Sequence, residues 1–134
     1  MESADSTASS RTRGTASYSY PQPWIFVSKV VGYLASDMVD EYVAAMAKTL
    51  GRGRKSVGFH EWSELPNYDS NARKRLTEWV LQQRSNMVEH HILVRSKLLA
   101  MGVSTASMLI GGHVITSYTD RASFERALQH VRGE

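Results

Sequence analysis

The sequence predicts an α/β domain built on a mainly parallel sheet of four to five strands with helices packed on it. Short runs of β-branched and aromatic residues alternate along the chain with segments whose apolar residues recur at helical spacing. Glycine, proline and helix-capping residues separate these segments. Because parallel neighbours need a crossover connection, strands that alternate with helices favour a parallel sheet.

The length suits a single folded domain preceded by a tail. A chain of 134 residues can bury one core but not two independent ones. Residues 1–17 contain many Ser and Thr and few aliphatic side chains, so burial there would not offset the entropy lost on ordering. We therefore expect a flexible tail over residues 1–17 and one domain over residues 18–134.

Composition excludes several classes of protein. Cysteine is absent, which rules out disulfides, thiolate nucleophiles and thiolate metal sites. No apolar run reaches the roughly 18 residues of a transmembrane helix, and the N-terminus lacks the apolar stretch of a secretory signal. The net charge of +3 is a mild excess that does not favour nucleic acid as a partner. We expect a cytoplasmic protein without a cofactor.

The first predicted strand and helix cover residues 24–50. Residues 24–31 form a β-branched and aromatic run closed by Gly32, which is typical of a buried strand. Ser36 or Asp37 can cap the next helix, whose apolar side chains continue at helical spacing to residue 50. Gly51 then ends that helix, because glycine favours the left-handed conformation of helix ends.

The second strand and helix follow a basic loop. Val57 and Phe59 alternate with smaller or polar residues, which predicts a strand over residues 56–62. Proline, asparagine and aspartate favour turns, so we expect a turn at Pro66, Asn67 and Asp69. Asp69 or Ser70 can cap a long helix that ends near residues 85–86.

The remaining elements lie between residue 88 and the C-terminus. Residues 88–95 contain a buried-strand pattern, and residues 96–110 favour a short helix interrupted by Gly102. Residues 113–118 predict a last strand. Thr119 or Asp120 can cap a terminal helix that closes at Gly133.

Three groups of residues together resemble one known family. The first is a strand-to-helix passage with a Gly-x-Leu turn, the second is a strand followed by an Asp-Ser helix start, and the third is the last strand with its helix. These groups are Val30, Val31, Gly32, Tyr33, Leu34 and Asp37; residues 57–68 with Asp69, Ser70, Asn71 and Ala72; and residues 118–128. The chain, over about residues 24–131, resembles the STAS domain of SpoIIAA-type anti-sigma-factor antagonists and their SpoIIAA-like relatives.

The resemblance implies a non-catalytic regulatory protein-interaction domain of bacterial-type signalling. In phosphorylated members of the family, the serine after the aspartate accepts phosphate from a partner kinase, and that position is Ser70 here. The partner would be a protein, such as an anti-sigma-factor-like kinase. The candidate partner-binding residues are Tyr68, Asp69, Asn71, Arg73, Lys74 and Arg75. Helix capping alone also explains Asp69 and Ser70, since either side chain can accept from free backbone N–H groups.

A basic cluster follows Ser70 in the sequence. Arg73, Lys74 and Arg75 fall in the first turn of the predicted helix, where cations oppose the helix dipole. A phosphoserine or acidic partner near Ser70 would compensate, and the basic residues of loop 52–55 could add to the cluster if that loop approaches. The alternative is a solvated polar face.

The histidines do not form a local metal site. His90 and His91 are adjacent, so on a strand they point to opposite faces and cannot both bind one metal directly. Assembly of His60, His91 and His113 across neighbouring strands stays open beside the interpretation as separate structural histidines. We do not expect an enzyme, because no nucleophile elbow, phosphate-binding glycine loop or diagnostic carboxylate pair occurs.

Two further hypotheses remain open. The apolar segment 98–110, with its glycine interruption, could cover an apolar pocket for a small molecule or lipid. A homodimer is the other alternative. An aromatic patch beside Ser70 would favour a protein partner. An enclosed apolar cavity of several hundred Å³, the usual size of a ligand pocket, would favour a small-molecule ligand.

Overall fold

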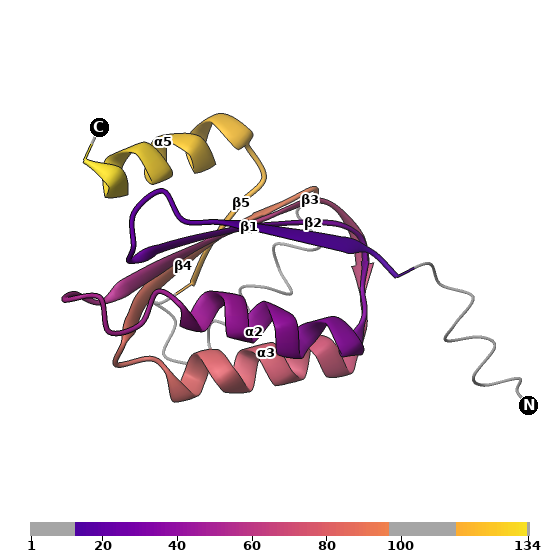
Figure 1. The fold of residues 1–134 in the computed structure, drawn as a ribbon. Helices are drawn as coiled ribbons and strands as arrows, with labels where there is room; N and C mark the ends of the chain where they lie inside the picture. Colours follow the sequence, from indigo (N-terminus) through magenta and orange to yellow (C-terminus); the bar gives the residue numbers. More distant parts are fainter. Residues whose placement is uncertain (1–12, 97–114, 134) are drawn as a thin grey trace, which may run out of the picture.

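A five-stranded sheet organises the molecule (Figure 1), and the computed structural model describes residues 13–96 and 115–133. The strands are β1 (Thr15–Ser19), β2 (Ile25–Leu34), β3 (Ser56–Tyr68), β4 (Met87–Val94) and β5 (Ile115–Tyr118). They lie in the sheet in chain order, with β1 antiparallel to β2 and the other neighbours parallel. The predicted α/β class with a mainly parallel sheet is confirmed.

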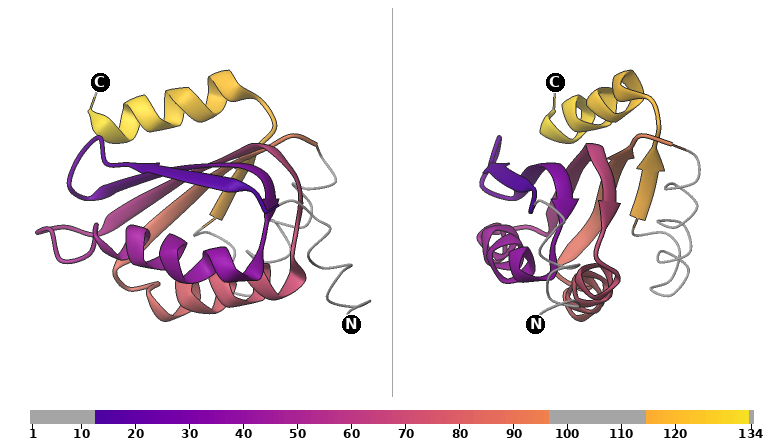
Figure 2. Two further views of the ribbon diagram at one scale, coloured as in Figure 1. Left: turned by 45° about the vertical axis from the view of Figure 1, so that its right-hand side comes forward. Right: turned by 90° about the vertical axis from the view of Figure 1, so that its right-hand side faces the viewer.

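Helices cover both faces of this sheet (Figure 2). After the short 3-10 helix η1 (Ser36–Met38), helices α2 (Val39–Ala47) and α3 (Ser70–Gln82) lie side by side on one face. Helix α5 (Arg121–Arg132) lies on the opposite face. Within the described residues, no helix is long and apolar enough to cross a membrane. The core is divided accordingly into one apolar cluster on the α2–α3 side and another beneath α5.

Strand β3 contributes to both sides of the sheet because its side chains alternate. Val57 and Phe59 belong to the cluster beneath α5. Gly58 and His60 face the α2–α3 side, where His60 borders a cavity. The central strand therefore places polar side chains under the two paired helices.

Strand β1 begins inside the segment that the sequence assigns to the tail. Its burial alternates between exposed and half-buried residues, and Ala16 and Tyr18 pack against the core. The Tyr18 ring stacks on Phe26, with their centroids 5.7 Å apart. Small and polar residues dominate this strand, so the hydrophobic pattern did not predict it. Residues 15–17, which the sequence assigns to the tail, pair with β2. Residues 1–12 lie outside the described part of the chain.

The turn predicted at Pro66 and Asn67 is wrong, because β3 runs on to Tyr68. Strand β3 pairs with β4 as far as Trp62. Beyond Trp62, its only partner among the described strands is β2. The β2–β3 register shifts between Glu64 and Asn67, so Pro66 stands at an irregularity. A proline without a backbone N–H is tolerated at such a position.

Two helix starts were predicted correctly. Asp69 caps α3 by accepting from backbone N–H groups, and Asp120 caps α5 in the same way from Ser123. Gly133 ends α5 with φ of 85°. The helix and lid segment expected within residues 96–110, and the start of the strand expected at His113, lie outside the described residues except for Ser96.

Candidate functional site

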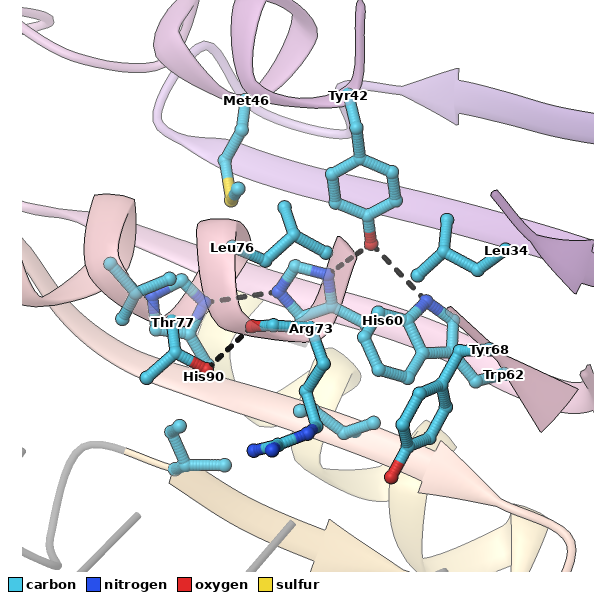
Figure 3. A pocket seen from close by; sticks show the side chains of 13 residues that line it. Leu34, Tyr42, Met46, His60, Trp62, Tyr68, Arg73, Leu76, Thr77 and His90 are labelled. Atoms are coloured by element: carbon cyan, nitrogen blue, oxygen red, sulfur yellow. Dashed lines mark hydrogen bonds between the residues drawn. The ribbon is translucent and has the colours of Figure 1, made fainter. Parts of the chain in front are cut away.

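A mainly apolar cavity lies between α3 and the sheet, and Figure 3 shows the side chains around it. Its volume is ≈ 70 Å³, several times the roughly 10–15 Å³ that one water needs. The cavity is much smaller than the several hundred Å³ of an ordinary ligand pocket, so it suits only a compact molecule. The apolar lining includes Leu34, Met46, Leu76, Val80, Ile92 and Ile115.

Two histidine rings form the polar wall of the cavity. Nε2 of His60 on β3 and Nδ1 of His90 on β4 lie 3.0 Å apart, within hydrogen-bonding distance. The rings are roughly parallel, with an interplanar angle of 26°. His60 is 4% exposed and His90 is 1% exposed. The pair is therefore a buried polar contact between neighbouring strands.

The pair is extended on the His60 side by a buried hydroxyl network. The Tyr42 hydroxyl from α2 lies 2.5 Å from Nδ1 of His60 and 2.5 Å from the Ser28 hydroxyl of β2. The indole N–H of Trp62 donates to the Tyr42 hydroxyl at 3.3 Å, a contact drawn in Figure 3. Five side chains from β2, α2, β3 and β4 thus share one network.

Gly58 makes the approach of the two rings possible. A Cβ atom at this position would lie 2.8 Å from Nε2 of His60 and 2.9 Å from Nδ1 of His90. Both distances are shorter than contacts that real side chains make. Any other residue at position 58 would push the rings apart, so the glycine belongs to the site.

Burial keeps both imidazoles neutral at pH 7. It lowers the pKa of His60 well below its usual value, and the neighbouring His90 adds to that effect. Burial, with His91 as a second cause, lowers the pKa of His90 to about 4. Burial also raises the pKa of the Tyr42 hydroxyl far above its usual value. The network is therefore uncharged, and each histidine carries one N–H.

One atom of this network has no partner. Among the described buried side-chain nitrogen and oxygen atoms, the Tyr18 hydroxyl and Nε2 of His90 lack a hydrogen bond. Tyr18 belongs to β1 and is not among the residues that line the cavity, whereas His90 is. An unpaired buried polar atom costs about 1–3 kcal/mol, and the rest of the fold offsets that cost at His90.

The predicted docking residues other than Asp69 divide into three groups in the structure. Tyr68 and Arg73 line the cavity, and the Thr77 hydroxyl donates to the Arg73 carbonyl at 2.8 Å. Ser70 and Lys74 are exposed on α3. Two residues tie α3 to η1: the Asn71 side chain donates to the Ser36 hydroxyl, and Arg75 donates to the Ser36 carbonyl.

Asp69 has a structural role. Its carboxylate accepts from the backbone N–H groups of Asn71 at 2.8 Å and Ala72 at 3.1 Å. The Tyr33 hydroxyl also donates to this carboxylate, at 3.3 Å. The carboxylate therefore already occupies two of the backbone donors that a phosphate on Ser70 would seek.

The two basic segments do not converge. The loop 51–55 precedes β3 and Ser70 follows it, so they lie at opposite ends of that strand. The Arg54 guanidinium instead lies 3.6 Å from the centroid of the Trp24 ring, a cation–π contact. Arg75 pairs with Asp40 of α2. A combined anion site from both segments is thus contradicted.

His91 lies on the face opposite to His90, as predicted. Its ring stacks on Phe59 with centroids 4.4 Å apart and hydrogen bonds to the Tyr118 hydroxyl and the Glu89 carboxylate. His60 therefore meets His90 and not His91. In the described ranges, no group of three or more His, Asp or Glu side chains could hold a metal ion, and His113 falls outside those ranges.

The comparisons with known proteins establish the fold. No family model and no curated protein matches the chain. Among solved structures, the chain is similar to an uncharacterized protein of the DUF3478 family from Shewanella loihica PV-4, which has a SpoIIAA-like fold. The TM-score is 0.65 at 14% identity, and the match covers 87% of this chain and 94% of that chain. The fold is therefore SpoIIAA-like, as the sequence resemblance implies.

Proposed function

We propose that this domain binds a compact apolar molecule in the cavity between α3 and the sheet, without catalysing a reaction on it. The observation that carries the proposal is a mainly apolar cavity, lined by aliphatic side chains, whose wall includes the buried pair His60 and His90. Ligand pockets combine an apolar lining with a few polar groups that fix orientation. The lining residues Tyr68, Arg73 and Thr77 carry polar groups of this kind, and the aliphatic side chains supply the apolar lining.

The elements around the cavity suit a preformed site. The lining residues come from β2, α2, β3, α3, β4 and β5, so the walls belong to the sheet and its two paired helices. Side chains on such elements are held more firmly than side chains on loops. A preformed pocket loses less entropy on binding, which supports a binding function.

The state of the buried groups supports binding rather than catalysis. A general base works best when its pKa lies near the working pH, whereas the pKa of His90 is lowered to about 4 by burial. Ser28 carries the hydroxyl at the end of the network, but it is fully buried and is not among the described lining residues. It therefore cannot reach a molecule in the cavity as a nucleophile.

A titration with xenon, a compact apolar probe that enters dry apolar cavities, tests the proposal. Methyl NMR spectra of the full chain should show saturable shifts at Leu34, Leu76, Val80, Ile92 and Ile115, which line the cavity. Val80→Phe adds a ring inside the cavity and should abolish the shifts. Leu128→Phe is a similar enlargement on α5, which covers the opposite face of the sheet, and should leave the methyl shifts unchanged. Absent shifts in the unaltered protein, or equal shifts in the Val80→Phe protein, would contradict the proposal.

The second candidate is a regulatory protein-interaction domain switched at Ser70. The observation that favours it is the exposed Ser70 hydroxyl at the first residue of α3, beside the exposed Lys74. Phosphate there would add negative charge at a helix N-terminus, where the dipole favours it. The cap carboxylate of Asp69 would oppose that charge. An interaction domain of this kind would act in the cytoplasm on a kinase or another protein.

Partner capture with Ser70 variants tests this second candidate. Ser70→Asp should weaken or redirect partner binding while leaving the free energy of unfolding nearly unchanged, and Ser70→Ala serves as the uncharged control. Identical sets of captured proteins for both variants and the unaltered chain would remove the switch. Size measurement of the same samples separates a homodimer from a partner complex.

A further inference from the structure

We infer that the molecule in the cavity is a short-chain carboxylate, whose alkyl chain lies among the aliphatic side chains and whose carboxylate pairs with the Arg73 guanidinium at the mouth. This inference rests on the proposed ligand-binding function and adds the chemical class of the ligand. It follows from the place of Arg73 at the border of the cavity, from the lack of a charged partner for its guanidinium, and from the size of the apolar space.

Arg73 stands between the cavity and the outer surface of α3. It lines the cavity, and it also lines a shallow hollow on the exposed side of the helix, together with Ser70 and Lys74. Figure 3 shows its guanidinium pointing away from the two histidine rings. An arginine covers apolar surface with its methylene stem while its charged end reaches water. Arg73 therefore forms part of the mouth of the cavity.

The Arg73 guanidinium has no acceptor in the described part of the chain, where none of the ion pairs involves it. Two residues further along the helix, Arg75 is by contrast paired with Asp40. The carboxylate of Asp69, one turn before Arg73, already accepts from two backbone N–H groups and the Tyr33 hydroxyl. The charged end of Arg73 is thus available to an anion.

The charge of the ligand belongs at the mouth and not in the interior. Both imidazoles of the polar wall are neutral, because burial lowers their pKa values, so a carboxylate beside them would lose its hydration without gaining a charged partner. At the mouth, the paired N–H groups of a guanidinium match the two oxygens of a carboxylate. Glu78 also lines the outer hollow, and its negative charge favours a singly charged carboxylate over a doubly charged phosphate.

The size of the apolar space limits the chain of the ligand. Its volume of ≈ 70 Å³ is less than that of an engineered apolar cavity of roughly 150 Å³ that binds benzene. A short branched alkyl chain therefore suits the space better than a ring. Each methylene group that it buries should strengthen binding by about fourfold. The anion 3-methylbutanoate has this shape and charge.

A pair of matched probes tests the ligand class. At pH 7, 3-methylbutanoate and 3-methylbutanamide have nearly the same shape and differ in charge. NMR titrations of the full chain measure both affinities at the methyl groups of Leu76 and Val80, which line the cavity, and the Nε–H resonance of Arg73 reports contact with the carboxylate. The acid should bind about tenfold more tightly than the amide, because hydrogen bonds between charged groups are stronger than neutral ones.

Two variants that each lose one positive charge separate a contact at Arg73 from a general effect of charge. Arg73→Gln should abolish the preference for the acid. Arg84→Gln changes an exposed residue beyond the end of α3 that does not line the cavity, and it should keep the preference. Arg73→Lys retains the charge without the paired N–H groups and should show a smaller preference, so it provides the comparison if Arg73→Gln does not fold.

The xenon titration separates failure of this inference from failure of the proposed function. If xenon shifts the cavity methyl resonances but the two probes bind equally or not at all, the inference is overturned and the proposed function stands. The same preference in Arg73→Gln as in the unaltered protein would also overturn the inference alone. If xenon leaves those resonances unmoved, the proposed function and the inference fail together.

Discussion

Gly58 and His90 are in such close contact that a single added methyl group would separate the two histidine rings. A Cβ at Gly58 would lie 2.9 Å from Nδ1 of His90. The same atom would lie 2.8 Å from Nε2 of His60. The buried contact between the rings therefore depends on a residue that has no side chain.

Gly58→Ala should destabilise the protein by about 1–3 kcal/mol, because overpacking a buried site forces side chains from their positions. Urea unfolding followed by circular dichroism measures this change. Gly51→Ala is the comparison: its added Cβ meets nothing within 4 Å, and its cost of about 1–2 kcal/mol comes from a positive φ alone. Gly58→Ala should also shift the ring resonances of both histidines, and Gly51→Ala should not. Unchanged ring resonances in Gly58→Ala would contradict the contact.

Stability should fall as the pH drops from 7 to 5. The unfolded chain binds protons at its histidines below about pH 6.5, whereas folded His90 stays neutral down to about pH 4. The stability contributed by neutral burial is thus present above pH 6.5 and is lost as the pH falls toward 4. His90 alone accounts for about 2 kcal/mol between pH 7 and pH 5.

Urea unfolding at the two pH values checks this dependence. His90→Phe should show a smaller loss of stability, because one buried imidazole has been removed. His130→Gln, a change at an exposed position on α5, should show the same loss as the unaltered protein. A free energy of unfolding that does not change between pH 7 and pH 5 would mean that these rings are not buried and neutral.

Tyr42→Phe should cost more stability than Tyr20→Phe. The Tyr42 hydroxyl contacts Ser28, His60 and Trp62 in the buried network, and its removal leaves several polar groups unsatisfied. The expected loss is about 1–3 kcal/mol. The Tyr20 hydroxyl donates one hydrogen bond, to the Ala45 carbonyl, from a partly exposed residue. Thermal and urea unfolding compare the two variants, and equal losses would argue against a shared network.

Asp69→Ala should reduce stability by about 1 kcal/mol through loss of the α3 cap. The carboxylate accepts from two backbone N–H groups, and alanine offers no acceptor for them. Asp120→Ala removes the corresponding cap of α5 and should cost a similar amount. Ser70→Ala should cost little, because Asp69 provides the capping acceptor. A larger loss from Ser70→Ala than from Asp69→Ala would reverse these roles.

The fold was predictable where local signals agreed. The helix starts at Asp69 and Asp120 combine a capping side chain with a following apolar stripe, so capping and periodicity indicate the same boundary. Strand β1 gave no comparable signal, because Thr, Ala and Ser dominate it and its stability comes from pairing with β2. Pro66 misled the prediction, since a proline normally marks a turn and here stands at a register shift inside β3.

The site was less accessible to sequence reasoning. The alternation of Gly58 and His60 on one strand face, and the opposite orientation of His90 and His91, were visible in the sequence. What brings His60 to His90 is the parallel register, in which Gly58 pairs with His90. That register depends on tertiary packing and not on either strand alone. The sequence therefore placed His90 on the correct strand without indicating its partner.

A crystal structure of the full chain under xenon pressure tests the proposed binding function most directly. We expect xenon inside the cavity between α3 and the sheet, in contact with lining side chains such as Leu76, Val80 and Ile92. A cavity that stays empty while other sites on the protein fill would contradict the proposal.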